Sequence, residues 1–181
     1  RMGIKFTMHS HERTLAASLG FADPDKKNAR HDMAIQYLMR DDVLRSVMEI
    51  VTKEDGVWAA DLEHINATPE FHIMKGNGWT VGFADLLVRY TLPGRGQRGG
   101  LIEVKINPLP VGDIMRQIGL YTASLGGGFA RTILVTDFDM CLEDVATLRT
   151  KSIYHVRLGA KFDAYCAERL ASPQKALSLE I

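Results

Sequence analysis

The sequence predicts an α/β (α+β) fold in which helices cover a mixed central sheet. Three observations support this prediction. The first third of the chain has helical periodicity, and residues 57–106 form successive strand-like segments separated by turn residues. A helical segment then precedes a continuous apolar run at 130–138, which is typical of a buried strand. The order helix, strand meander, helix, buried strand, helix indicates a layered sandwich.

Length and composition favour one globular domain. The chain has 181 residues, of which 46% are hydrophobic, enough for one sizeable core. We expect a single domain over 1–181, with an N-terminal helical segment at 1–55, a core at 57–138 and a C-terminal α/β extension at 139–181. Two cysteines are too few for a disulfide scaffold or a four-thiolate zinc site.

Charge and hydropathy restrict the partners. The chain has 22 Lys and Arg and 22 Asp and Glu residues, so its formal net charge is zero. A nucleic acid would therefore have to be held by a local basic patch. No apolar run approaches the ~20 residues of a membrane span, and the first residues do not resemble a signal peptide. We expect a cytoplasmic protein without a membrane partner.

Helices are predicted first. Residues 10–20 begin with a serine cap, carry Leu15 and Leu19 one turn apart and end in glycine. A longer helical segment spans about 30–52, with an apolar stripe of Leu44, Val47, Met48 and Val51. We expect a break near 40–42, where Asp41 would cap the second piece.

Strands follow. Residues 57–65, 70–74 and 79–92 are rich in β-branched and aromatic residues, and the turn-forming "NATP" and "KGNG" separate them. The glycine-rich segment 93–100 predicts a hairpin connection to a strand at 101–106. Beyond it, 113–128 predicts a helix closed by three glycines, and 130–138 the buried strand. We expect Asp139 to cap the next helix at Cys141, followed by a strand and a final helix.

Three charges interrupt two of these strands. Asp85 lies within "GFADLLVRY", and Glu103 and Lys105 lie within "LIEVKI". Because side chains alternate along a strand, a hairpin can bring all three to one face. A solvated face with weak ion pairs is the alternative. An unpaired carboxylate among the apolar neighbours of Asp85 would, however, be costly.

Two carboxylates beside a lysine have a specific chemical use. Carboxylate oxygens suit Mg²⁺, which commonly takes only one or two of them from a protein. A lysine beside such a metal can orient a water molecule or offset the charge that develops on a phosphate.

The order of these residues resembles the D…E-x-K core of the PD-(D/E)XK nuclease superfamily. "GFAD" resembles the G-x-x-D segment of RecB-like nucleases, "EVK" their E-h-K and "QIGLY" their Q-h-x-x-Y, in the family's order over residues 80–121. The resemblance implies a restriction-endonuclease-like αβββαβ core. It also implies a DNA nuclease that uses Mg²⁺, with Mn²⁺ as a substitute, and releases 5′-phosphate and 3′-hydroxyl ends.

The resemblance also implies a site. Asp85, Glu103 and the Val104 carbonyl would hold the metal, Lys105 would position the nucleophile, and Gln117 and Tyr121 would belong to the active site or contact DNA. These last two are four residues apart, hence on one helix face, although the stripe position of Tyr121 equally suits a core residue.

An acidic residue or histidine on an early helix often completes such sites. The sequence leaves the choice open between His31, Asp32, Glu49, Glu63 and Glu12, with a solvated face the simpler role for Glu49. Asp137 and Asp139 suggest a second acidic site, against the capping role of Asp139.

DNA contacts are expected from Arg95 and Arg98 in the hairpin and from Arg116 on the later helix, although a solvated turn explains the first two equally well. We expect the protein to act as a homodimer or within a larger nucleic-acid-processing complex. Two alternatives remain: a catalytically degenerate nuclease fold that binds nucleic acid or protein, and a non-nuclease domain whose charged sheet face is a protein interface.

Overall fold

The computed structural model of the chain describes residues 29–76, 78–125 and 129–171. The expected helix at 10–20, Glu12 and the three glycines at 126–128 lie outside these ranges. The described residues contain one five-stranded sheet in the order β1-β2-β3-β4-β5. Its strands are β1 (Glu63–Met74), β2 (Thr80–Leu92), β3 (Gly96–Lys105), β4 (Phe129–Thr136) and β5 (Ile153–Arg157).

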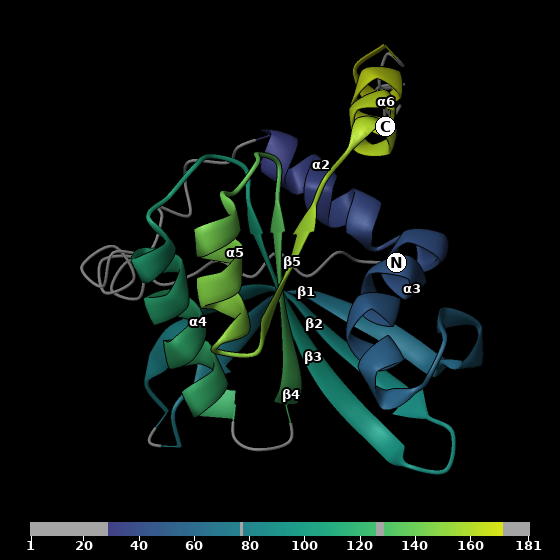
Figure 1. Ribbon diagram of the computed structural model, residues 1–181, viewed down its shortest axis with the longest axis vertical. Coiled ribbons are helices and arrows are strands. Elements are labelled where there is room, and N and C mark those ends of the chain that lie inside the picture. Colours follow the sequence, from purple (N-terminus) through teal and green to yellow (C-terminus); the bar gives the residue numbers. More distant parts are fainter. Residues whose placement is uncertain (1–28, 77, 126–128, 172–181) are drawn as a thin grey trace, which may run out of the picture.

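The sheet is mixed and is covered by helices, which confirms the predicted fold class. β1, β2 and β3 are antiparallel neighbours, whereas β3, β4 and β5 are parallel. Figure 1 shows α4 and α5 to one side of the sheet and α2 and α3 to the other. The helices are α2 (Ala29–Leu38), α3 (Asp41–Thr52), α4 (Val111–Leu125), α5 (Leu142–Arg149) and α6 (Ala160–Ala171), with 3₁₀ turns η1 (Lys53–Asp55) and η2 (Ala59–Asp61).

The element order from α3 to β4 is helix, three strands, helix, strand, the αβββαβ order that the resemblance implies. Parallel β3 and β4 require a crossover, which α4 supplies. None of the described helices is long and apolar enough to cross a membrane.

The largest core cluster joins α2, α3 and α6 to one face of the sheet, through residues such as Leu38, Met48, Val88, Ile133 and Phe162. On the other side, α4 and α5 pack through Ile114, Ile118 and Leu148 onto Leu134. A third cluster joins Tyr121 of α4 to Ala84 of β2 and Leu101 of β3. The sheet is therefore buried on both faces.

β1 differs from the prediction. A strand at 57–65 is wrong except for its last three residues, because 59–61 form η2. The "NATP" segment is not a turn: Asn66, Ala67, Thr68 and Pro69 all pair with β2. β1 is at the edge of the described sheet, where a proline is tolerated within a strand.

The predicted caps are also wrong. Arg40 precedes α3 as its N-cap, and Asp41 instead forms an ion pair with Arg45 at 2.9 Å. Cys141 is the N-cap of α5, whereas Asp139 lies 2.9 Å from Arg157. In both cases a nearby arginine takes the carboxylate that the sequence assigns to a helix end.

Candidate active site

Asp85 and Glu103 lie where two paired strands separate. The β2–β3 ladder runs from Leu92↔Gly96 to Leu86↔Ile102 and stops one residue short of both carboxylates. β2 continues beside β1, and β3 beside β4. Asp85 Oδ2 accepts the Val104 N–H at 2.7 Å, so a carboxylate replaces the backbone partner that a continued ladder would provide.

Glu103 is a buried carboxylate with one unused oxygen. Its exposed fraction is 1%, and Lys105 Nζ lies 2.7 Å from its Oε1. Glu103 Oε2 is buried and has no hydrogen-bond partner within the described part of the chain. Burial, together with the charge of Asp85, raises the pKa of Glu103 to about 7. Such an atom can accept a proton or a cation.

Lys105 remains a cation in this setting. Burial alone would lower its pKa, but the charges of Glu103 and Asp85 outweigh burial and raise the pKa. The three side chains therefore form one electrostatic unit at the end of β3, as the alternation of residues along the strands predicts.

His31 is the early residue that the structure brings to the site. It lies in the first turn of α2, and its Nε2 is 3.2 Å from Asp85 Oδ1. The hydrogen bond to Asp85 raises the pKa of His31 despite partial burial.

The other early candidates lie apart from Asp85. Asp32 is 4.0 Å from the far ring nitrogen of His31, and Glu49 accepts the Ala59 N–H at 3.0 Å. Glu63 is exposed at the start of β1, opposite Thr91. Sequence alone could not choose between them, because the choice depends on where α2 lies over the sheet.

Gln117 and Tyr121 form a bonded pair on α4. Gln117 Nε2 donates to the Tyr121 hydroxyl at 2.9 Å, and that hydroxyl donates to the Phe83 carbonyl at 3.1 Å. Burial, and then the negative charge of Glu103, raise the pKa of Tyr121. A Cβ at Gly82 would lie 2.8 Å from the Tyr121 ring and hydroxyl. The glycine of "GFAD" therefore makes room for the tyrosine of "QIGLY".

Of the predicted DNA contacts, Arg116 is exposed on α4, next to Gln117, and lies 3.5 Å from Asp113. Arg95 lies in the β2–β3 turn at the far end of the ladder, 3.9 Å from Asp55. Arg98 is exposed in the same hairpin and contacts the Gln97 carbonyl. The turn is roughly 25 Å of strand away from Asp85.

The donors suit a small divalent cation, although no group of three or more His, Cys, Asp or Glu side chains within the described ranges forms a ready metal site. Glu103 Oε2 is unused, and Mg²⁺ commonly takes only one or two protein carboxylates. His31 Nε2 adjoins this pair of carboxylates, 3.2 Å from Asp85 Oδ1.

The second acidic site does not form. Asp137 is occupied by Arg30, and Asp139 by Arg157. In the sequence, Arg30 stands beside His31, and Asp137 follows the buried strand. No signal in the sequence links Arg30 to Asp137.

Comparisons with known proteins add little. No family model matches the chain, and no curated protein matches it. One solved structure, titled "MspJI Restriction Endonuclease in Complex with 27-mer Oligonucleotide", is similar with a TM-score of 0.38 and 13% identity. The match covers 94% of this chain and 36% of that chain, so this chain spans about a third of its length.

Proposed function

We propose that the protein is a metal-dependent DNA nuclease that hydrolyses phosphodiester bonds to 5′-phosphate and 3′-hydroxyl products. The single observation that supports this most is the unused, buried Oε2 of Glu103 beside Asp85 and Lys105. A buried carboxylate oxygen without a partner is costly. Its retention within a D…E-x-K pattern favours a functional role over a structural one.

Each residue of the proposed site would have its own role. Asp85, Glu103 and the Val104 carbonyl, with His31 adjacent, would hold Mg²⁺ or a substituting Mn²⁺, which supplies Lewis-acid stabilisation of the charge on the scissile phosphate. Lys105, kept charged by Glu103, orients the attacking water and offsets the negative charge that develops during attack.

Gln117 and Tyr121 complete the proposed site from α4. Because the Tyr121 hydroxyl is held by Gln117 and by the Phe83 carbonyl, the pair fixes the helix against the strand that carries Asp85. The exposed part of Gln117 is then available to DNA, as is the neighbouring Arg116. Arg95 and Arg98 would reach only a duplex that extends along the whole β2–β3 hairpin.

Three further features belong to the proposal: DNA as the partner, a cytoplasmic setting, and action as a homodimer or within a larger nucleic-acid-processing complex. The setting and the oligomeric state do not enter the chemistry of the site.

A cleavage assay tests the function. Linear, circular, single-stranded and branched DNA are incubated with the wild type in Mg²⁺, Mn²⁺ or EDTA, and the product ends are labelled. We expect metal-dependent cleavage with ends that accept ligation without prior phosphorylation. Absence of cleavage on every substrate would contradict the nuclease proposal and favour a catalytically degenerate binding module.

A further inference from the structure

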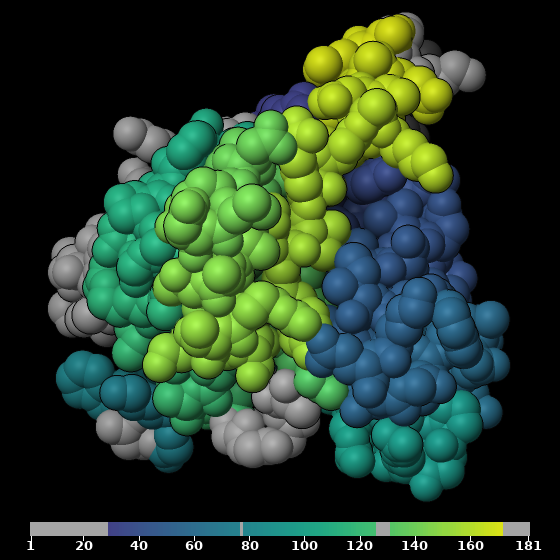
Figure 2. Space-filling view, in the orientation of Figure 1, coloured from purple at the N-terminus to yellow at the C-terminus, as the bar shows by residue number. Residues whose placement is uncertain are grey.

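Arg30, next to His31, connects the start of α2 to two other elements. Its guanidinium forms a two-pronged contact with Asp137, through Nε to Oδ2 and through Nη2 to Oδ1 at 2.9 Å. Nη2 also donates to Asp163 Oδ1 of α6 at 2.6 Å. The same guanidinium lies over the Phe162 ring, 4.9 Å from its centroid. In Figure 2 the purple start of α2 lies at the base of the projecting yellow α6.

Asp137 is in turn fixed to the strand that carries Glu103 and Lys105. Its backbone N–H donates to the Lys105 carbonyl at 3.0 Å. The Val104 N–H donates to Asp85, and Asp85 contacts His31. The contacts therefore form a closed ring: from Asp85 to β3, from β3 to Asp137, from Asp137 to Arg30, and through one peptide bond to His31.

We propose that Arg30 is a positioning residue that holds His31 against Asp85 by locking the start of α2 to Asp137. The inference rests on the proposed function, in which His31 adjoins the metal. It adds a residue with no counterpart in the D…E-x-K or Q-h-x-x-Y patterns. The contact of Arg30 with Asp137 ties this part of α2 to the end of β4, and His31 next to it lies 3.2 Å from Asp85.

Asp137 is the partner that matters for this role. Its side chain is 12% exposed, whereas that of Asp163 is 62% exposed. Exposed ion pairs contribute little, because water and salt screen them. A lysine at position 30 would keep the charge but lose the planar fork that engages both oxygens of Asp137. Arg30→Lys and Asp137→Asn should therefore act alike, and Asp163→Asn should act weakly.

The first test needs neither metal nor cleavage. The His31 ring signals are recorded by ¹⁵N NMR in the metal-free wild type and in four variants: Arg30→Lys, Asp137→Asn, Asp163→Asn and Asp85→Asn. We expect the Arg30→Lys and Asp137→Asn signals to move toward those of Asp85→Asn, because His31 leaves its partner in each. The signals of Asp163→Asn should stay near those of the wild type. Wild-type His31 signals in both Arg30→Lys and Asp137→Asn would overturn the proposal.

The second test measures Mn²⁺ affinity by calorimetry. Residues that orient a metal ligand typically change the affinity by about 10- to 100-fold. We expect Arg30→Lys to weaken Mn²⁺ binding roughly 10-fold in the wild-type background and less than about twofold in a His31→Ala background. Arg131→Lys, in a charged cluster at the other end of β4, is the matched control and should lower the melting temperature without changing the affinity.

The two tests distinguish a failure of the proposed role of Arg30 from a failure of the proposed nuclease function. An equal loss of Mn²⁺ affinity from Arg30→Lys with and without His31 would mean that Arg30 does not act through His31. A wild type that cleaves no DNA would defeat the proposed function, but the ring signals of His31 would still decide the role of Arg30.

Discussion

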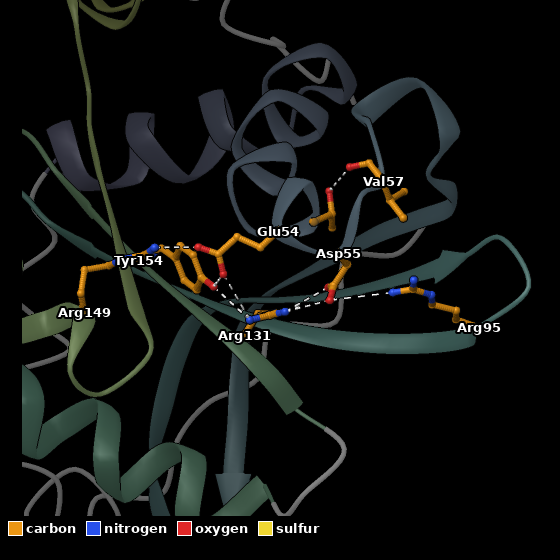
Figure 3. Close-up of polar contacts among 8 residues, drawn as sticks. Glu54, Asp55, Val57, Arg95, Arg131, Arg149 and Tyr154 are labelled. Carbon is orange, nitrogen blue, oxygen red and sulfur yellow. Dashed lines mark hydrogen bonds and ion pairs between the residues drawn. The ribbon is translucent and has the colours of Figure 1, made fainter.

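The two ends of the sheet each carry a cluster of carboxylates and cations, but they differ in one oxygen: within the described part of the chain, Oε2 of the buried Glu103 has no hydrogen-bond partner. At the far end, shown in Figure 3, Arg131 Nη2 binds both oxygens of Asp55 at 3.1 and 3.0 Å. Arg149 donates to Glu54 Oε1 at 2.6 Å, and the Tyr154 hydroxyl donates to Glu54 Oε2. Every carboxylate oxygen there has a partner.

The pKa shifts of the two glutamates have opposite signs. The bonds from Tyr154 and Arg149 lower the pKa of the exposed Glu54. Burial and the charge of Asp85 raise that of Glu103. The bonds of the far cluster thus favour the ionised form of Glu54, as structural ion pairs do, whereas burial and the charge of Asp85 oppose ionisation of Glu103. We expect this contrast to separate a stabilising network from the proposed metal site.

The largest expected effect is on cleavage. Asp85→Ala, Glu103→Ala or Lys105→Ala should each reduce metal-dependent cleavage by roughly three orders of magnitude. The melting temperatures of Asp85→Ala and Glu103→Ala should equal or exceed that of the wild type, because truncation relieves charge crowding. Lys105→Ala should melt at a lower temperature, because it leaves the buried Glu103 without its cation. Circular dichroism and thermal melting accompany the assay. Wild-type cleavage rates in all three variants would contradict the proposed role of these residues in cleavage.

A change in the far cluster should affect stability and leave cleavage unchanged. Arg131→Ala removes the partner of both Asp55 oxygens and a donor to the Tyr154 hydroxyl. We expect it to lower the free energy of unfolding by about 1–3 kcal/mol, with cleavage and Mn²⁺ affinity unchanged well below the melting temperature. Denaturant unfolding measures the first quantity. A loss of cleavage at full stability would make the far cluster part of the site.

The pH dependence of stability should differ between wild type and Glu103→Gln. In metal-free protein the folded state holds the Glu103 proton more tightly than the unfolded chain, with a pKa raised from 4.5 to about 7. Protons therefore stabilise the fold across this window, and raising the pH through it removes that stabilisation.

The measurement is thermal melting in EDTA from pH 5 to 8. The melting temperature of the wild type should fall relative to Glu103→Gln as the pH rises, and the variant should be the more stable protein at pH 8. A constant difference between the two proteins across this range would argue against a proton-binding Glu103.

The smallest expected effect is on DNA binding by the exposed arginines. Arg116→Ala, beside Gln117, should weaken DNA binding and flatten the slope of log affinity against log salt by about one unit. The double change Arg95→Ala and Arg98→Ala should alter the slope by less, since Arg95 lies near Asp55 at the far end. Binding in Ca²⁺ over a salt series tests both. A larger effect of the hairpin pair would place DNA along the whole length of β2 and β3.

Much of the fold could be predicted because its signals are local. Apolar periodicity indicates α3 and α4, the continuous apolar run indicates β4, and the glycine-rich segment indicates the β2–β3 hairpin. The predicted connection at 93–100 is too long, because residues 96–100 belong to β3 and pair with β2. β1 could not be predicted as one strand. Its "NATP" segment has turn chemistry, and only its pairing with residues 86–89 of β2 makes it extended.

The candidate site also has a part that the sequence predicts and a part that it does not. Alternation along two strands is enough to bring Asp85, Glu103 and Lys105 together. The choice of His31 among five early residues and the link from Arg30 to Asp137 both depend on how α2 lies across the strand ends. That is set by tertiary packing between residues more than 50 positions apart.

Calorimetric titration of Mn²⁺ tests the contrast between the two clusters most directly. We expect one site per chain in the wild type, tighter for Mn²⁺ than for Mg²⁺. The site should be lost in Asp85→Asn and in Glu103→Gln and retained in Glu54→Gln at the far end. A Mn²⁺ isotherm that is unchanged in Asp85→Asn and Glu103→Gln, or one that disappears in Glu54→Gln, would contradict the assignment of the metal to the unused oxygen of Glu103.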